Sequence, residues 1–240
     1  MRDQLDQVLT EPVSGLAYRI RPAQAQAQAG KAPCLVLLHG VGANEAGFIE
    51  LARQMDPRLV VILARGPLTL APGRHAWFQV RFTPSGPAIE AAQAERARTT
   101  LIDFIGQLPA RHEVDPARIW VAGFSQGGIM SAGVALTSPG SVAGFGVLSG
   151  RILPEIQPLL APAPLLGKLH AFVSHGRGDQ TLGIHFAHQS RALLGKLGVP
   201  LAYHEYEAGH ALDHAMVRDL RQWLDRRLEE TAAYRPAAFS

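Results

Sequence analysis

The amino-acid sequence predicts an α/β fold built on an open, mostly parallel sheet with helices on both faces. Short apolar runs rich in Val, Ile and Leu, each bounded by turn residues, lie at residues 34–38, 59–63, 118–122, 144–148, 169–174 and 201–206. Continuous runs of this length are typical of parallel strands that are covered on both faces. Helical patterns separate these runs, and this alternation of strand and helix favours a parallel sheet.

Two helices are predicted from apolar residues that recur at intervals of three and four positions. The first stripe comprises Ala94, Ala97, Leu101, Phe104, Ile105 and Leu108. The second comprises Leu212, Met216, Leu220, Trp223, Leu224 and Leu228. Each stripe marks the face with which a helix packs on the sheet.

Other segments carry different patterns. Residues 16–21 alternate between apolar and polar side chains, which predicts an edge strand. Residues 22–30 hold an Ala-Gln repeat between a proline and a glycine, which indicates a mobile hairpin loop. We interpret the Pro-rich residues 66–87 and 153–167 as irregular loops. The second loop is too short for an independent helical lid, so no separate cap domain is expected.

Composition narrows the class of protein. The 240 residues are 47% hydrophobic and 18% charged, which excludes an intrinsically disordered chain because the apolar surface is ample. The net charge of +3 is weak over this length and argues against nucleic-acid binding. Because the chain shows neither an internal repeat nor a dividing linker, residues 1–240 are predicted to form a single domain.

Targeting signals and cysteine usage add further expectations. No uninterrupted apolar stretch approaches the ~20 residues that span a bilayer, and the N-terminus shows no apolar leader. We therefore expect no membrane span and a cytoplasmic location. The single cysteine, Cys34, excludes an internal disulfide and a multi-cysteine metal site, and we interpret it as a core residue.

The residues that follow the predicted strands carry the candidate chemistry. In sheets of this kind, ligands bind beyond the carboxyl ends of the strands. Four of these ends carry the Gly-rich turn 39–42, Ser125, Asp179 and His210. We therefore expect these groups to converge at one edge of the sheet.

Ser125 is the candidate nucleophile. Residues 123–127 read Gly-Phe-Ser-Gln-Gly and match the G-x-S-x-G pattern. In this nucleophile elbow, a sharp strand-to-helix turn exposes the serine Oγ, and the glycines let the strand and the helix approach closely. The alternative is an ordinary glycine-rich turn. We favour the elbow because an apolar strand precedes the motif and a helical pattern at 127–136 follows it.

A serine nucleophile needs a general base and a group that orients this base. The chain order associated with the elbow is Ser, Asp, His. Asp179 and His210 fit that order and both follow strands, so they are predicted to form a triad with Ser125. Asp213 and His214 are the rivals. We favour His210 because it alone combines this order, a post-strand loop and a preceding glycine.

Stabilisation of a tetrahedral intermediate requires N–H donors aimed at its oxyanion. The elbow supplies the backbone N–H of the residue after the serine, which is Gln126. We assign the second donor to Val41, in the His-Gly-Val-Gly turn at residues 39–42. On its own, that turn would be interpreted as an ordinary tight strand exit.

Ten histidines raise the alternative of a metal site. A zincin-type site needs a His-x-x-x-His pair on a helix with a glutamate between the histidines. His210 and His214 stand four positions apart, but no glutamate lies between them. We therefore predict no metal ligands.

Five motifs occur along the chain in a fixed order. They are the turn 39–42, the Gly-Phe-Ser-Gln-Gly-Gly of 123–128, the Leu-Ser-Gly of 148–150, the His-Gly-x-Gly-Asp of 175–179 and the Gly-His of 209–210. Over residues 31–228 the chain resembles the phospholipase/carboxylesterase family of α/β-hydrolases, which includes acyl-protein thioesterases and small bacterial esterases. The resemblance implies an α/β-hydrolase fold, no cofactor, and the triad and oxyanion donors assigned above. Some members of the family are dimers, so the resemblance also allows a homodimer.

We therefore expect a serine carboxylesterase that hydrolyses short or medium acyl esters through an acyl-enzyme, with a small-molecule ester as its partner. Lysophospholipase and acyl-protein thioesterase use the same machinery, so both alternatives stay open. A serine peptidase is disfavoured because nothing in the sequence suggests a peptide-binding cleft. A catalytically silent hydrolase fold used for binding is disfavoured because such proteins usually lack a triad member, and none is missing here.

The substrate-binding residues are predicted to lie in two loops. Trp77 and Phe78 resemble the family's aromatic pair near the acyl site, although each also fits an ordinary core position. Together with Leu153, they are predicted to line a shallow apolar groove whose opposite walls are the loops 66–87 and 153–167. Further aliphatic surface is expected from Leu70, Ile156 and Leu159.

Overall fold

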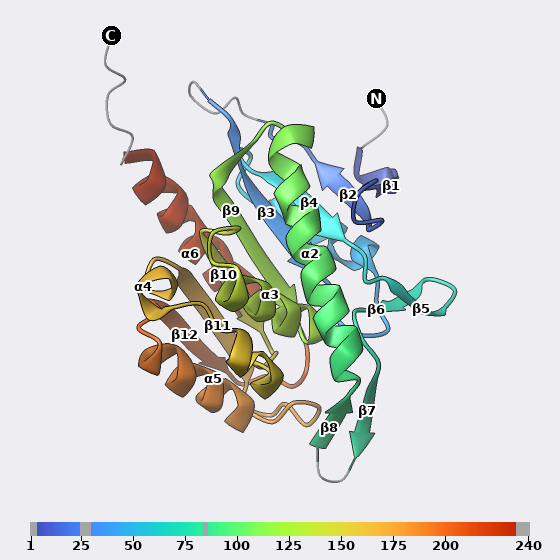
Figure 1. Ribbon diagram of the computed structural model, residues 1–240, viewed down its shortest axis with the longest axis vertical. Coiled ribbons are helices and arrows are strands. Elements are labelled where there is room, and N and C mark those ends of the chain that lie inside the picture. Colours follow the sequence, from blue (N-terminus) through green and yellow to red (C-terminus); the bar gives the residue numbers. More distant parts are fainter. Residues whose placement is uncertain (1–3, 25–29, 84–85, 234–240) are drawn as a thin grey trace.

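The computed structural model describes residues 4–24, 30–83 and 86–233. These residues form an eight-stranded central sheet with the order β1-β2-β4-β3-β9-β10-β11-β12 (Figure 1). Its strands are β1 (Leu9–Thr10), β2 (Ala17–Arg21), β3 (Ala32–Leu38), β4 (Val60–Ala64), β9 (Val114–Phe124), β10 (Gly144–Leu148), β11 (His170–Gly176) and β12 (Leu201–Tyr206). The hairpin loop predicted at residues 22–30 lies outside the described residues from position 25 to 29.

The sheet is mostly parallel, as predicted. Each of the six apolar runs forms one of the parallel strands, β3, β4 and β9 to β12. Strands β1 and β2 are antiparallel. The prediction that residues 16–21 form an edge strand is wrong, because Leu9 and Thr10 pair with Tyr18 and Ala17 and cover that side.

Helices cover both faces of the sheet (Figure 1). One face carries α2 (Ala91–Arg111), α3 (Gln126–Thr137) and α5 (His185–Lys196), and the other carries α1 (Ile49–Gln54) and α6 (His214–Ala233). Strand side chains point alternately to the two faces. In β3, Val36 and Leu38 therefore pack with α2 and α3, whereas Leu35 and Leu37 pack with α1 and α6.

The two predicted helices are present. All six residues of the first apolar stripe are buried in α2. The second stripe is buried on α6 from Met216 onward, but Leu212 lies before the helix, which begins at His214. None of the helices in the described residues is long and apolar enough to cross a bilayer.

The two Pro-rich loops differ in structure. Residues 153–167 contain only a 3₁₀ helix (Pro154–Leu159) and the one-turn helix α4 (Ala163–Leu166). The prediction that residues 66–87 are irregular is wrong, because this segment forms two hairpins with short strands. They are β5 (Leu68–Ala71) with β6 (Arg74–Ala76), and β7 (Val80–Thr83) with β8 (Gly86–Ile89). Such short strands offer no long apolar run by which sequence periodicity detects them.

The strand register brings the post-strand turns together. Leu38 of β3 lies opposite Gly123 of β9, and Phe124 lies opposite Leu148 of β10. In turn, Leu148 lies opposite Ser174 of β11. The ends of these four neighbouring strands therefore meet at one edge of the sheet, where parallel α/β folds bind ligands.

Candidate active site

Ser125 lies in the one-residue turn between β9 and α3. Its backbone has φ 54° and ψ −116°, in a positive-φ region that is costly for a residue with a side chain. The Ser125 N–H donates to the Leu148 carbonyl oxygen at 2.8 Å, and its own carbonyl accepts from Ile129 N–H at 3.1 Å. These bonds to β10 and α3 hold the strained turn, which has the geometry of the predicted elbow.

Ser125, His210 and Asp179 form one chain of hydrogen bonds. His210 Nε2 lies 2.9 Å from Ser125 Oγ, and His210 Nδ1 lies 2.6 Å from Asp179 Oδ2. The other carboxylate oxygen, Oδ1, accepts from the backbone N–H groups of Thr181 and Leu182 at 2.9 and 2.8 Å. The carboxylate is thus fixed on both oxygens, and an Nδ1–H donor leaves Nε2 free to accept from the serine hydroxyl.

Contacts between the loops after β11 and β12 bring the aspartate and the histidine together. Arg177 N–H donates to the Tyr206 carbonyl at 2.8 Å, and Gly178 N–H donates to the Ala208 carbonyl at 3.0 Å. A Cβ on Gly176 would lie 2.3 Å from the Ala208 carbonyl oxygen. Glycine at 176 therefore lets the two loops touch, although Asp179 and His210 lie 31 residues apart in sequence.

His175 lies beneath the aspartate. Its Nε2 lies 2.6 Å from the Leu182 carbonyl oxygen and 3.3 Å from Asp179 Oδ2. The side chain is fully buried, and this burial lowers its pKa. His175 therefore stays neutral near neutral pH and supports the 179–182 turn.

Val41 and Gln126, the two residues predicted to supply oxyanion donors, lie close to Ser125. Both line the same pocket as Ser125. Gln126 is the first residue of α3, and the first N–H groups of a helix have no acceptor within the helix. A Cβ on Gly40 would lie 3.3 Å from Ser125 Cβ, so the turn that carries Val41 packs against Ser125.

The side chain of Gln126 has a separate role. Its Oε1 accepts from Trp77 N–H at 2.8 Å, and its Nε2 donates to the Phe78 carbonyl at 2.7 Å. The indole Nε1–H of Trp77 donates to the His39 carbonyl at 2.9 Å. Trp77 is 1% exposed and does not line the pocket, so it supports the 39–42 turn from the core.

We call the cavity beside Ser125 the serine pocket. It is narrow and mostly apolar, and it is lined by Val41, Phe78, Val80, Pro87, Ile89, Ser125, Gln126, Ile129, Arg151 and Leu182. Of the three predicted substrate-binding residues, the structure brings only Phe78 into this pocket.

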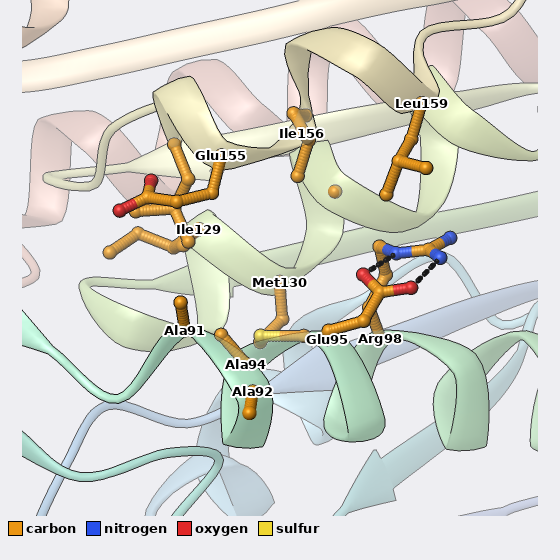
Figure 2. Close-up of a pocket in the computed structure, with 12 residues that line it drawn as sticks. Ala91, Ala92, Ala94, Glu95, Arg98, Ile129, Met130, Glu155, Ile156 and Leu159 are labelled. Atoms are coloured by element: carbon orange, nitrogen blue, oxygen red, sulfur yellow. Dashed lines mark hydrogen bonds and ion pairs between the residues drawn. The ribbon is translucent and has the colours of Figure 1, made fainter.

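Leu153 lies in a neighbouring cavity of about 290 Å³ between α2, α3 and the 154–159 helix, which we call the α2–α3 cavity. Figure 2 shows Ile156 and Leu159 on one side of this cavity and Ala91, Ala92 and Ala94 of α2 on the other. Ile129 lines both cavities. Leu70 lies in a third cavity of about 380 Å³, which shares Val41, Phe78 and Val80 with the serine pocket. The residues predicted to line a single groove are therefore divided among separate cavities.

The rival residues lie elsewhere. His214 is the first residue of α6 and is exposed, and Asp213 Oδ1 accepts the Ala215 N–H at 2.7 Å. Neither forms a hydrogen bond with Ser125. In the part of the chain that the structure describes, no three His, Cys, Asp or Glu side chains gather in a way that could hold a metal ion.

Sequence reasoning missed Arg151, which lines the serine pocket. The residue follows the Leu-Ser-Gly turn at the end of β10, so the rule that ligands bind beyond strand ends would have included it. Ile129 and Leu182 were missed as well. Ile129 lies in α3 and Leu182 follows Asp179. No local sequence pattern separates residues that line the serine pocket from ordinary core residues.

Comparison with known proteins agrees with this fold. Residues 22–228 match the profile of the family described as Phospholipase/Carboxylesterase. Acyl-protein thioesterase 1 of Mycosarcoma maydis is 25% identical, with 80% of this chain and 90% of that protein covered. A probable carboxylesterase of Oryza sativa subsp. japonica is 26% identical, with 91% and 86% covered. The crystal structure of a carboxylesterase from Mesorhizobium loti has a TM-score of 0.77 and 25% identity, with 91% of this chain and 98% of that chain covered.

The family match spans most of the chain, and the sheet order and helical layers are those of an α/β-hydrolase. This chain belongs to the phospholipase/carboxylesterase family and is a hydrolase of the α/β-hydrolase fold.

Proposed function

We propose that this protein is a serine carboxylesterase that hydrolyses short or medium acyl esters. The observation that carries the proposal is the hydrogen-bonded chain from Asp179 through His210 to Ser125, with distances of 2.6 and 2.9 Å. Its nucleophile stands on a strained elbow and faces a mostly apolar pocket. An acyl ester needs an activated hydroxyl, an oxyanion site and an apolar contact surface, and the residues supply all three.

The proposed mechanism has two stages. His210 takes the proton of Ser125 Oγ as this oxygen attacks the ester carbonyl, and Asp179 stabilises the imidazolium that forms. The backbone N–H groups of Val41 and Gln126 hold the oxyanion. His210 then protonates the departing alcohol, and water, activated by the same histidine, releases the acid from the acyl-enzyme.

Thioesters are the second candidate substrate, because several relatives bear the name acyl-protein thioesterase 1. The same Ser125 attack serves an oxygen ester or a thioester. Parallel assays with 4-nitrophenyl butyrate and an S-butyryl thioester separate the two preferences by the ratio of kcat/KM.

The test of the proposal is Ser125→Ala. We expect this variant to keep the wild-type melting temperature and to lose at least ~10⁴-fold in kcat. An organophosphate should label Ser125 in the wild type. Ser149→Ala is the matched control, because Ser149 is also buried at a strand end with positive φ and its Oγ has no hydrogen-bond partner. Labelling of Ser131, Ser149 or Ser174 would refute the assignment.

A further inference from the structure

Arg151 brings a charged side chain to the wall of the serine pocket. It follows Gly150, and a Cβ on Gly150 would lie 2.9 Å from the Ser125 carbonyl oxygen, so this part of the chain packs on the nucleophile turn. Arg151 lines the serine pocket together with Ser125 and Val41. The other lining side chains are apolar apart from Gln126, whose amide is bonded to the Trp77–Phe78 backbone.

The guanidinium of Arg151 uses few of its five N–H donors. Nη2 donates to the Pro87 carbonyl at a long distance of 3.4 Å, and Nε is buried without a partner. The guanidinium carbon lies 4.9 Å from the centre of the Phe186 ring, which is a cation–π contact. This contact orients the guanidinium but accepts none of its hydrogen bonds.

No carboxylate among the described residues forms an ion pair with Arg151. Two other partly buried arginines have one, since Arg65 pairs with Glu45 and Arg98 pairs with Glu95, whereas the buried Arg21 donates to backbone carbonyls instead. The acidic residue that acts on Arg151 is Glu155, and it does so only through longer-range attraction. Burial lowers the pKa of Arg151, because the charged form loses hydration that no partner replaces.

Because Arg151 is partly buried and has no ion-pair partner, its guanidinium is suited to bind an anionic ligand. The planar fork of arginine matches a carboxylate, with which it forms two parallel charge-assisted hydrogen bonds. Binding such a group would satisfy the free donors and offset the desolvation of the cation. The Phe186 ring would hold the fork in place, so little side-chain freedom would be lost on binding.

We propose that Arg151 binds a carboxylate of the substrate, so that this hydrolase prefers half-esters, which carry a free carboxylate, over neutral esters of the same length. The inference rests on the proposed function. In the reaction, Ser125 Oγ forms a bond with the ester carbonyl carbon, the acyl C–O bond breaks, and the Ser125 proton passes through His210 to the leaving alcohol. Water then releases the acid and restores Ser125.

The experiment has two arms, because the carboxylate can belong to the acid or to the alcohol. The acid arm compares monoethyl glutarate with ethyl pentanoate, which have acyl chains of equal length. The alcohol arm compares 4-carboxyphenyl butyrate with 4-carbamoylphenyl butyrate. Titration of the released acid gives kcat/KM for all four. We expect the carboxylate substrate to be favoured at least about tenfold in one arm, and that arm identifies the source of the carboxylate.

Arg151→Gln should remove the preference, so that kcat/KM falls at least about tenfold more for the carboxylate ester than for its neutral partner. Arg151→Lys keeps the charge without the fork and should keep part of the preference. Arg191→Gln is the matched control. Arg191 also lies over an aromatic ring, with its guanidinium carbon 5.0 Å from the centre of the Tyr203 ring, but it does not line the serine pocket. Its substitution should leave the preference unchanged.

A binding measurement adds a readout that does not depend on turnover. Calorimetry with Ser125→Ala should detect binding of glutarate if the acid arm carries the preference, or of 4-hydroxybenzoate if the alcohol arm does. Adding Arg151→Gln should weaken this binding at least about tenfold.

Three outcomes would overturn the proposal. The wild type could show no preference for the carboxylate ester in either arm, or Arg151→Gln could lower kcat/KM equally for carboxylate and neutral esters. The third is that Arg191→Gln lowers the preference as much as Arg151→Gln does. Failure of the proposed function looks different. In that case Ser125→Ala would still hydrolyse ethyl pentanoate. Ethyl pentanoate hydrolysis that depends on Ser125, with no carboxylate preference, would refute the role of Arg151 alone.

Discussion

Gly127 in the first turn of α3 lies directly against Leu38 at the end of β3. A Cβ on Gly127 would lie 1.9 Å from the Leu38 carbonyl oxygen and 2.4 Å from its carbonyl carbon. Only a residue without a Cβ allows the helix to approach the strand this closely. The approach is what brings Ser125, two residues before Gly127, next to the turn that carries Val41.

Gly127→Ala should therefore destabilise the fold. The added Cβ meets backbone atoms that cannot rotate away, so the cost is at the upper end of overpacking, about 3 kcal/mol. For a chain of this size that corresponds to a fall in Tm of roughly 6 °C or more, measurable by calorimetry.

Gly106→Ala is the control for this variant. Gly106 lies in α2, and nothing stands within 4 Å of the Cβ it would carry. Because alanine favours the helix interior, this change should raise stability by roughly 0.5–1 kcal/mol. A Gly127→Ala protein as stable as the wild type would contradict the close-packing argument.

His210→Ala should lower kcat by several orders of magnitude, because removal of a triad base leaves the serine without activation. His214→Ala should stay within about tenfold of wild type, or ~1.4 kcal/mol of barrier. His214 is a matched control because it lies four residues away and is exposed at the start of α6. Steady-state kinetics on one soluble ester decides the point, and equal losses at both positions would leave the assignment of the base without support.

The value of kcat/KM should rise over the first few carbons of the acyl chain and then fall for longer chains. Each CH₂ that becomes buried adds ~0.8 kcal/mol until the wall of the serine pocket is reached. Ile129→Ala should move the optimum to longer chains, because Ile129 lines both the serine pocket and the α2–α3 cavity of about 290 Å³. A series of 4-nitrophenyl esters from acetate to palmitate measures the profile.

Ile105→Ala controls for loss of stability in the Ile129 variant. Ile105 is a buried isoleucine of α2 that lines neither cavity. Its substitution should therefore lower the stability of the fold but leave the preferred acyl-chain length unchanged. We also expect no jump in rate where the substrate aggregates, since the 153–167 loop is no lid. Sharp interfacial activation, or a wild-type preference for C16 over C4–C8, would count against this view.

Glu45 should make stability depend on acid pH. Burial opposes its ionisation, but hydrogen bonds from Arg65 and Arg19 outweigh this and lower its pKa from 4.5 to about 2. The ionised carboxylate therefore stabilises the fold above pH 4.5, and that contribution is lost as the pH falls towards 2. Glu45→Gln should cost about 3 kcal/mol at pH 7, and the difference from wild type should shrink at pH 3.

Urea unfolding at both pH values measures this difference. Glu50→Gln serves as the control, since Glu50 is exposed and its contact with Arg53 at 3.7 Å is a surface ion pair. Its loss should change stability by less than about 0.5 kcal/mol. A Glu45→Gln effect that stays constant between pH 7 and pH 3 would contradict the assigned ion-pair cluster.

The sequence by itself determined the parallel sheet and the positions from which the candidate site is built. Long apolar runs report strands covered on both faces, and parallel strands bring their carboxyl ends to one edge. The sequence alone therefore predicts that the turn 39–42, Ser125, Asp179 and His210 meet at that edge. Their catalytic roles stay predictions, to be tested as above.

Only the tertiary structure decided what lines the pocket. Trp77 and Phe78 are neighbours in sequence, yet one supports a turn from the core and the other faces the serine pocket. The residues next to Arg151 in the sequence do not indicate whether a carboxylate side chain pairs with it in the fold. Lining and pairing depend on contacts between segments far apart in the chain, such as β8, α3 and the turn after β10. Local periodicity reports which face of an element is buried, but not which distant side chain it meets.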